Sequence, residues 1–153
     1  MIEPDVVALL ESGAATMVGT VDADGKPAGM HAIGVQVLDD GTLRVALNAE
    51  ETEVLDNLRA TGVVALAATD VPTLRSVQVK GRALAVEPLT AEDRIRTDRY
   101  LAAFFQVVSE TDGTPLDLLA RLVPRELVVL VMTVDELYDQ TPGPQAGASL
   151  VRA

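Results

Sequence analysis

The clearest hydrophobic pattern in the chain lies at residues 43–47, where Leu43, Val45 and Leu47 alternate with less apolar neighbours. Alternation with a period of two predicts a half-buried strand. Apolar residues at positions 54, 55 and 58 then follow at helical spacing. We therefore expect a short helix directly after the strand. Asn48, with Glu51 three residues later, is the predicted cap at which this helix begins.

Five further segments have the composition of strands, namely 14–21, 28–38, 63–69, 75–86 and 127–134. The segment 75–86 is the most informative. Its alternation places Ser76, Gln78, Lys80 and Arg82 on one face and apolar residues on the other. Residues 22–27 and the Asp-Asp-Gly sequence at 39–41 predict turns.

The remaining regular segments are predicted helices. Residues 4–11 form one, and Thr90 with Asp93 begins a longer one that runs to about residue 108. Thr114 as the N-cap, with Pro115 at the first helical position, predicts a brief helix, and residues 135–140 suggest one helical turn. The apolar stripe of the longer helix is expected to pack inward; it comprises Ile95, Leu101, Phe104, Phe105 and Val108.

Six strands joined by short connections indicate antiparallel pairing, and closure into a small barrel removes exposed sheet edges. The predicted fold class is therefore mainly β (α+β), a six-stranded antiparallel barrel with peripheral helices. A single domain is expected over residues 1–140. Residues 141–153 contain Pro and Gly and are predicted to form a tail, or an arm laid on a partner.

Composition narrows the possible partners. The net charge of −11 and an aromatic content of 3% argue against nucleic acid and against an anionic membrane surface. No apolar run approaches the roughly 20 residues that a membrane helix needs. The absence of Cys and an acidic N-terminal segment without signal-peptide character predict a cytoplasmic protein.

The sequence also limits the chemistry that side chains can perform. With one His and no Cys, a His/Cys metal site is excluded, and the acidic residues lack metal-loop spacing. Any Ser-His-acid triad would have to use His31. Neither a Gly-x-Ser-x-Gly motif nor a glycine-rich phosphate loop is present. We therefore predict no metal and assign no catalytic residue.

Four motifs, in this order, resemble those of the pyridoxamine 5′-phosphate oxidase-like family, the flavin-binding split β-barrels. They are Asp-Gly-Lys-Pro at 24–27, Asp-Asp-Gly-Thr-Leu at 39–43, Asn-Leu-Arg at 57–59 and Arg-Ser-Val-Gln-Val-Lys-Gly-Arg-Ala at 75–83. The resemblance covers nearly the whole chain, and the order and spacing of the motifs carry it. It implies a split β-barrel that forms a homodimer and holds FMN at the subunit interface.

The resemblance also implies a set of cofactor-binding residues. Contacts to the flavin ring are expected from His31, Ala32 and Ile33, and contacts to the phosphate or ribityl chain from Asn48, Thr52, Arg75, Ser76, Gln78 and Lys80. Many family members have a Lys just before the Asn-Leu pair, but here that position falls at about Val54, beside Glu53. A phosphate would meet repulsion from the neighbouring carboxylates. Arg75 or Lys80 could supply the missing cation.

Each candidate also has a simpler structural interpretation. A lone His is more often an ordinary strand residue than a ligand or base, and a haem-ligand role for His31 is the weaker alternative. Asn48 would cap the helix, while Glu50, Glu51 and Glu53 would face solvent beside its positive end. The polar residues at 76–82 would be the outer face of a strand. Phe104 and Phe105 would belong to the core.

Two functions remain. The favoured hypothesis is an FMN-binding, homodimeric oxidoreductase that acts on a small molecule, because a flavin supplies the redox chemistry that the side chains lack. The deazaflavin F420 suits an acidic chain less well, since its tail is anionic. The alternative is a split-barrel ligand-binding or structural protein that has lost flavin binding. Its support is the missing lysine and the acidic turn at 50–53, and Glu53→Lys combined with Val54→Lys would distinguish the two.

Overall fold

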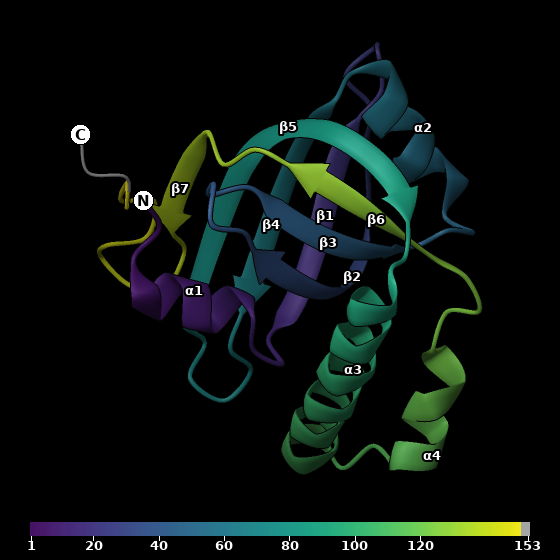
Figure 1. Ribbon diagram of the computed structural model, residues 1–153. Helices are drawn as coiled ribbons and strands as arrows, with labels where there is room; N and C mark the ends of the chain where they lie inside the picture. Colours follow the sequence, from purple (N-terminus) through teal and green to yellow (C-terminus); the bar gives the residue numbers. More distant parts are fainter. Residues whose placement is uncertain (151–153) are drawn as a thin grey trace.

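The computed structural model describes residues 1–150, which form a closed antiparallel barrel with helices at its periphery (Figure 1). The strand order is β4-β1-β2-β3-β6-β5-β7, and pairing between β4 and β5 closes the first six strands into the barrel. The strands are β1 (Ala15–Val21), β2 (Pro27–Val37), β3 (Leu43–Asn48), β4 (Val63–Thr69), β5 (Ser76–Pro88), β6 (Leu127–Met132) and β7 (Glu136–Asp139). This architecture confirms the predicted fold class.

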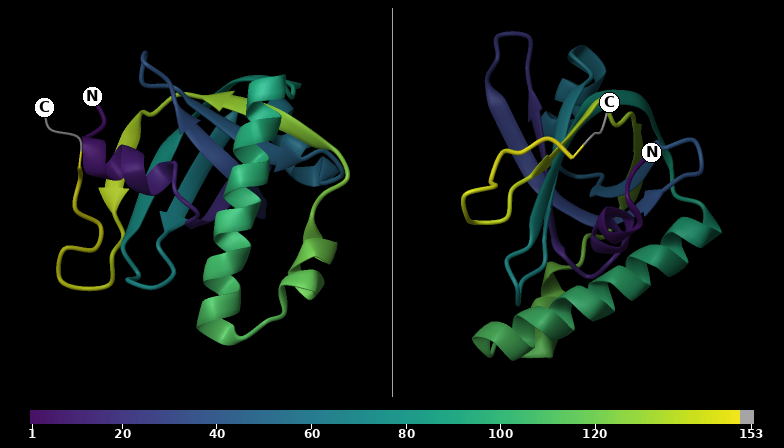
Figure 2. Two further views of the ribbon diagram at one scale, coloured as in Figure 1. Left: turned by 60° about the horizontal axis from the view of Figure 1, so that its bottom comes forward. Right: turned by 90° about the vertical axis from the view of Figure 1, so that its left-hand side faces the viewer.

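The helices occupy the ends and one side of the barrel. They are α1 (Pro4–Leu10), α2 (Thr52–Ala60), α3 (Ala91–Asp112), α4 (Leu116–Leu119) and the short 3-10 helix η1 (Ala120–Leu122). The N-terminal part of α3 packs near β2, whereas its C-terminal part and α4 extend away from the barrel as an arm (Figure 2). No helix within residues 1–150 is long and apolar enough to cross a membrane.

The barrel interior is filled by alternate residues of every strand. The inward side chains of β3, Leu43, Val45 and Leu47, are fully buried, as the period-two pattern predicts. Val79 of β5 and Leu130 of β6 meet them in the same core. This continuous apolar core fixes the barrel, so the outward residues of the same strands are available for function.

The predicted helical turn at 135–140 is wrong. Glu136–Asp139 forms the edge strand β7, which pairs antiparallel with β5 and buries Leu137. The following segment folds back on β7: the Gly147 N–H donates to the Asp139 carbonyl (2.7 Å) and the Leu150 N–H to the Leu137 carbonyl (2.8 Å). Residues 141–150 of the predicted tail therefore lie against their own chain, and residues 151–153 fall outside the described part.

Two predicted helix caps are also wrong. Helix α2 begins at Thr52 with Glu51 at the N-cap and no side-chain cap. The Asn48 side chain instead accepts a hydrogen bond from the Glu50 N–H (3.0 Å) and stabilises the turn before the helix. Helix α4 has Pro115 at its N-cap, so Thr114 does not cap it. These short turns satisfy their backbone groups locally, which sequence spacing does not predict.

The capping pair of α3 is confirmed, because the Thr90 hydroxyl accepts from the Asp93 N–H (3.1 Å) and the Asp93 carboxylate accepts from the Thr90 N–H (2.9 Å). The predicted apolar stripe of this helix is only partly correct. Ile95 is 61% exposed, whereas the buried residues are Asp93, Thr97 and Tyr100. Burial raises the pKa of Tyr100 to about 12, and its hydroxyl donates to the Ala14 carbonyl (2.8 Å).

A partly buried ion-pair network, with Asp93 at its centre, attaches α3 to the barrel. Arg44 of β3 donates to both carboxylate oxygens of Asp93 (3.2 and 2.6 Å) and also pairs with Glu87, while Arg96 donates to Asp93 (2.9 Å). The Asp93 side chain is only 4% exposed. Burial alone would raise its pKa, but the hydrogen bonds from Arg44 and Thr90 outweigh this and hold the pKa of Asp93 well below its usual value.

This network makes the stability of the fold depend on pH in the acidic range. Because the folded-state pKa of Asp93 is depressed, its ionised form stabilises the fold above the unfolded-state pKa of about 3.9, and this contribution is lost as the pH falls further. We expect the urea midpoint of the wild-type protein to fall more steeply between about pH 5 and pH 2 than that of Asp93→Asn. Equal slopes for the two proteins would contradict this assignment.

Candidate functional site

The outer side of strands β1 and β4 is unusually apolar for a sheet surface. In an antiparallel sheet with one solvated face, outward positions are normally polar. Here Met17 is 42% and Val63 is 41% exposed, and none of the outward residues of β1 and β4 is charged. We call the outer side of β2, β1, β4 and β5 the open face. The outward residues of its two central strands are Ala15, Met17, Gly19, Val21, Val63, Ala65, Ala67 and Thr69.

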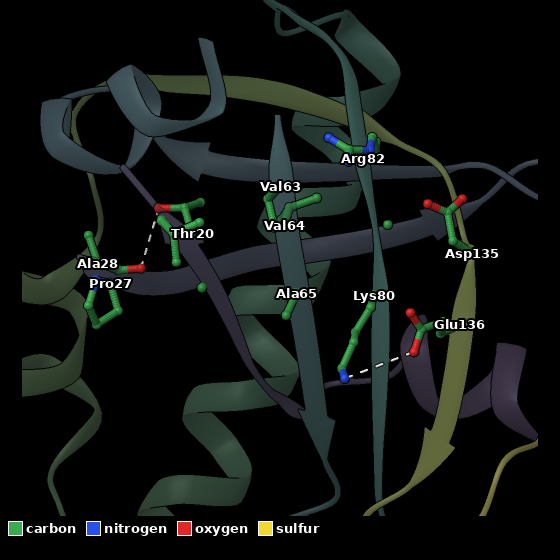
Figure 3. A pocket seen from close by; sticks show the side chains of 13 residues that line it. Thr20, Pro27, Ala28, Val63, Val64, Ala65, Lys80, Arg82, Asp135 and Glu136 are labelled. Carbon is green, nitrogen blue, oxygen red and sulfur yellow. Dashed lines mark hydrogen bonds and ion pairs between the residues drawn. The ribbon is translucent and has the colours of Figure 1, made fainter. Parts of the chain in front are cut away.

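A groove of about 380 Å³ crosses this open face (Figure 3). Gly19 and Ala65 form its floor, and Pro27 lies at the β2 end. Lys80 and Arg82 of β5 form the opposite wall. The volume is within the range of about 300–1,000 Å³ that is usual for small-ligand sites.

The groove floor is flat because its residues are small. Gly29, Gly19 and Ala65 are paired in register across three neighbouring strands, and Lys80 comes next in the same row. A Cβ atom built on Gly19 would meet no atom within 4 Å. The absence of a side chain at position 19 therefore leaves space in the groove and is not required by packing of the barrel.

Charged groups are confined to the β5 side of the groove. The Lys80 Nζ lies 4.0 Å from a Glu136 carboxylate oxygen and 5.0 Å from the centre of the Tyr138 ring. The Arg82 guanidinium donates to the Thr61 carbonyl (3.3 Å), and no ion pair is formed by Arg82 within residues 1–150. This wall therefore presents hydrogen-bond donors to a neutral floor.

Several residues predicted to bind the cofactor lie on this same face. His31 is exposed and pairs with Met17, which pairs with Ala67, which in turn pairs with Gln78. Three strand spacings separate His31 from Gln78, about 14 Å. The His31 ring lies 6.1 Å from that of Phe104. Lys80 lines the groove itself, so the fold brings His31, Gln78 and Lys80 together on one surface.

Three other predicted residues are less accessible. The Ala32 side chain is 1% exposed in the barrel core, so only its backbone could contact a ligand. Ile33 is covered by α3 in a cluster with Tyr100. The Ser76 hydroxyl is 2.8 Å from that of Thr69 and donates to the Leu74 carbonyl (3.0 Å), so its single O–H donor is already used.

Arg75 lies away from the groove. It precedes β5, pairs with Asp5 of α1 and lines a separate hollow with that residue. Its position is five residues from Lys80 along the strand, which is about 17 Å. Of the two cations suggested as replacements for the missing lysine, Lys80 is therefore the one on the groove.

Asn48 ends β3 and Thr52 begins α2, and the acidic residues of the intervening turn face solvent as predicted. The structure also places Lys26, from the β1–β2 turn, beside these residues. The Lys26 Nζ is 3.2 Å from a Glu53 carboxylate oxygen. Sequence reasoning did not anticipate this pair. Val54 is 2% exposed, so Val54→Lys would bury a charge, and Glu53→Lys alone is the better test of the acidic turn.

Gly19 and Arg82 are two of the groove residues that sequence reasoning missed as site residues. The sequence feature that could have pointed to Gly19 is that segments 14–21 and 63–69 do not alternate between polar and apolar residues. Arg82 shares the outward face of Lys80, but its pairing with Val63 of β4, the strand next to β1, depends on the strand order, which the sequence does not specify.

Comparison with known proteins agrees with this architecture. The family described as "Pyridoxamine 5'-phosphate oxidase" matches residues 2–141. No curated protein sequence is similar enough to count as a match.

Several solved structures share the fold. HupZ from Group A Streptococcus is 22% identical, with a TM-score of 0.58 over 96% of this chain and 100% of that chain. An F420 reductase is 20% identical, with a TM-score of 0.57 over 85% and 93%. A Clostridium acetobutylicum protein related to general stress protein 26 is 16% identical, with a TM-score of 0.55 over 90% and 87%. These likenesses show the fold alone.

Proposed function

Because the chain belongs to the pyridoxamine 5′-phosphate oxidase family, we propose that it is a homodimeric, FMN-binding oxidoreductase that acts on a small molecule. The observation that carries this proposal is the neutral, flat-floored groove with hydrogen-bond donors on one wall. A planar ring system fits a floor of small residues, and its polar edge can pair with the donors.

The residues of the open face suit the binding and orientation of a flavin. Gly19 and Ala65 leave space for a flat ring, while Lys80, Gln78 and His31 can offer polar contacts around it. Bound FMN would supply the electron or hydride transfer. The protein would then orient the cofactor and limit the access of water, which is consistent with the small number of acid, base and nucleophile candidates.

We propose a homodimer because the apolar residues of the open face are otherwise exposed to water. Strands β1 and β4 carry apolar residues on both sides, and a second copy would remove Met17 and Val63 from water. A stable interface buries about 800 Å² per partner, roughly a tenth of the 8538 Å² surface of this chain. Such pairing would also enclose the groove between the two copies.

Light scattering tests this assembly. We expect a mass of twice the 16.1 kDa of one chain, and we expect Ala67→Glu, which places a charge on the open face, to give monomers. The matched control Ala120→Glu, on the exposed η1 helix, should remain dimeric. A monomeric wild-type protein at tens of micromolar would contradict the proposed interface.

Titration of the purified protein with FMN tests the cofactor. Binding should quench flavin fluorescence, shift the visible flavin spectrum and saturate near one FMN per chain. A colourless protein that leaves both signals unchanged at high FMN concentration would refute the proposal.

The acidic turn before α2 favours the second candidate, a split-barrel protein that has lost flavin binding. Glu50, Glu51 and Glu53 are exposed there, and Lys26 is already paired with Glu53. This candidate predicts normal folding and dimerisation without flavin binding. If FMN affinity is absent in the wild-type protein and appears in Glu53→Lys, the second candidate is supported.

A further inference from the structure

We propose that Arg82, assisted by Lys80, binds the phosphate group of FMN and that the first turn of α2 does not. This assignment rests on the proposed function, because it specifies how one end of the proposed cofactor is held. It follows from three features of the structure: the charge of the α2 turn, the Arg82 guanidinium, which forms no ion pair within residues 1–150, and the side of β5 from which the two cations project (Figure 3).

The α2 turn repels an anion. Glu50, Glu51 and Glu53 are all exposed within four residues, and helix α2 contributes no lysine to the turn. Within the described residues, Lys26 forms the ion pair with this turn, and its contact with Glu53 offsets its charge. A phosphate placed there would have to break that pair and approach the remaining carboxylates.

Arg82 has the properties that the α2 turn lacks. Its guanidinium is always charged and has five N–H donors. One of its nitrogens donates to the Thr61 carbonyl. The remaining donors have no carboxylate partner within residues 1–150. The contact with Thr61 restrains the group at the groove wall, so less side-chain freedom is lost when an anion binds.

Lys80 can add a second positive charge. It lies two residues from Arg82 on the same side of β5, about 7 Å along the strand. Its 4.0 Å contact with Glu136 is a weak, exposed ion pair that an anion could replace.

The acidic residues near the groove lie behind the two cations. Figure 3 shows the Lys80 and Arg82 side chains on the β4 side of β5, whereas Asp135 and Glu136 lie on its β7 side. An anion above the groove floor therefore meets the cations first. The neutral floor formed by Gly19 and Ala65 remains available for the ring.

The test compares FMN with riboflavin, which lacks the phosphate. We expect the wild-type protein to bind FMN at least tenfold more tightly than riboflavin, with a preference that weakens as salt increases. Arg82→Gln should raise the FMN Kd about tenfold or more and change the riboflavin Kd less than twofold. Lys80→Gln should produce a smaller change in the same direction.

Two control variants separate this site from the α2 turn. Arg59→Gln removes an exposed arginine that is paired with Asp56, and it should leave both Kd values unchanged. Glu53→Gln should alter the ratio of the two Kd values by less than twofold. Circular dichroism of each variant checks that the fold is retained.

The outcomes distinguish the assignment from the proposed function. If both riboflavin and FMN bind, and the preference for FMN over riboflavin is unchanged in Arg82→Gln, the phosphate assignment is overturned and the flavin proposal remains intact. A preference that changes with Glu53→Gln would place the phosphate at α2 and would also overturn it. Failure of both flavins to bind would refute the proposed function, and the phosphate assignment with it.

Discussion

Gly19→Leu is expected to abolish FMN binding while leaving the barrel folded. The added side chain would project into the groove, because a Cβ at position 19 meets no atom of the chain within 4 Å. A leucine would occupy the space above Ala65, where a planar ring is proposed to lie. Since no contact inside the barrel changes and leucine is accepted in strands, the free energy of unfolding should fall little. We expect at least a hundredfold rise in the FMN Kd, measured by fluorescence quenching.

The matched control is Ala85→Leu, which adds a leucine at another exposed strand position outside the groove. It should bind FMN as the wild-type protein does. Gly19→Leu must also keep the wild-type thermal midpoint to within a few degrees and the wild-type mass in light scattering. If FMN binds to Gly19→Leu with wild-type affinity, the flavin does not lie in this groove.

The strands could be predicted because local alternation encodes them. Leu43, Val45 and Leu47 are inward in the structure as in the pattern, and the hydrophobic interior follows from the same rule applied to each strand. Strand β7 could not be predicted in this way. It has four residues with one buried side chain, Leu137, which is too short for a periodic signal. Its extended conformation is set by pairing with β5.

Helix α3 shows a different limit of sequence reasoning. A hydrophobic-stripe argument looks for apolar residues, whereas this helix buries Asp93 and Thr97. Asp93 can be buried because Arg44, 49 residues earlier in the chain, reaches it from β3. Such pairing depends on tertiary contacts, so the sequence could place the cap at Thr90 and still misassign which side of the helix faces the barrel.

The candidate site was partly predictable for a similar reason. The family resemblance and the period of two together placed Gln78 and Lys80 on an outward strand face, and the structure places His31 on the same surface. Neither argument could show that Arg75 is paired with Asp5, 70 residues away. The groove itself depends on the order of β2, β1, β4 and β5, which is a property of the whole sheet.

Gly81→Ala is expected to prevent the wild-type fold. A Cβ at position 81 would lie 2.0 Å from the Thr133 carbonyl oxygen and 2.8 Å from its carbonyl carbon. The two segments of the chain cannot easily separate here, since the Thr133 N–H donates to the Arg82 carbonyl and the Arg82 N–H donates to the Thr133 hydroxyl, both at 2.9 Å. We expect a loss of more than about 4 kcal/mol in the free energy of unfolding, measured with urea and circular dichroism.

Gly19→Ala is the control for this substitution, because it makes the same chemical change in the same sheet where the new Cβ meets open space. It should retain wild-type stability or gain about 0.5 kcal/mol through reduced freedom of the unfolded chain. The obstacle at position 81 is a backbone carbonyl, so Thr133→Ala should not rescue Gly81→Ala. A Gly81→Ala protein with a free energy of unfolding within about 1 kcal/mol of wild type would show that β5 and the segment after β6 do not approach as closely as this structure places them.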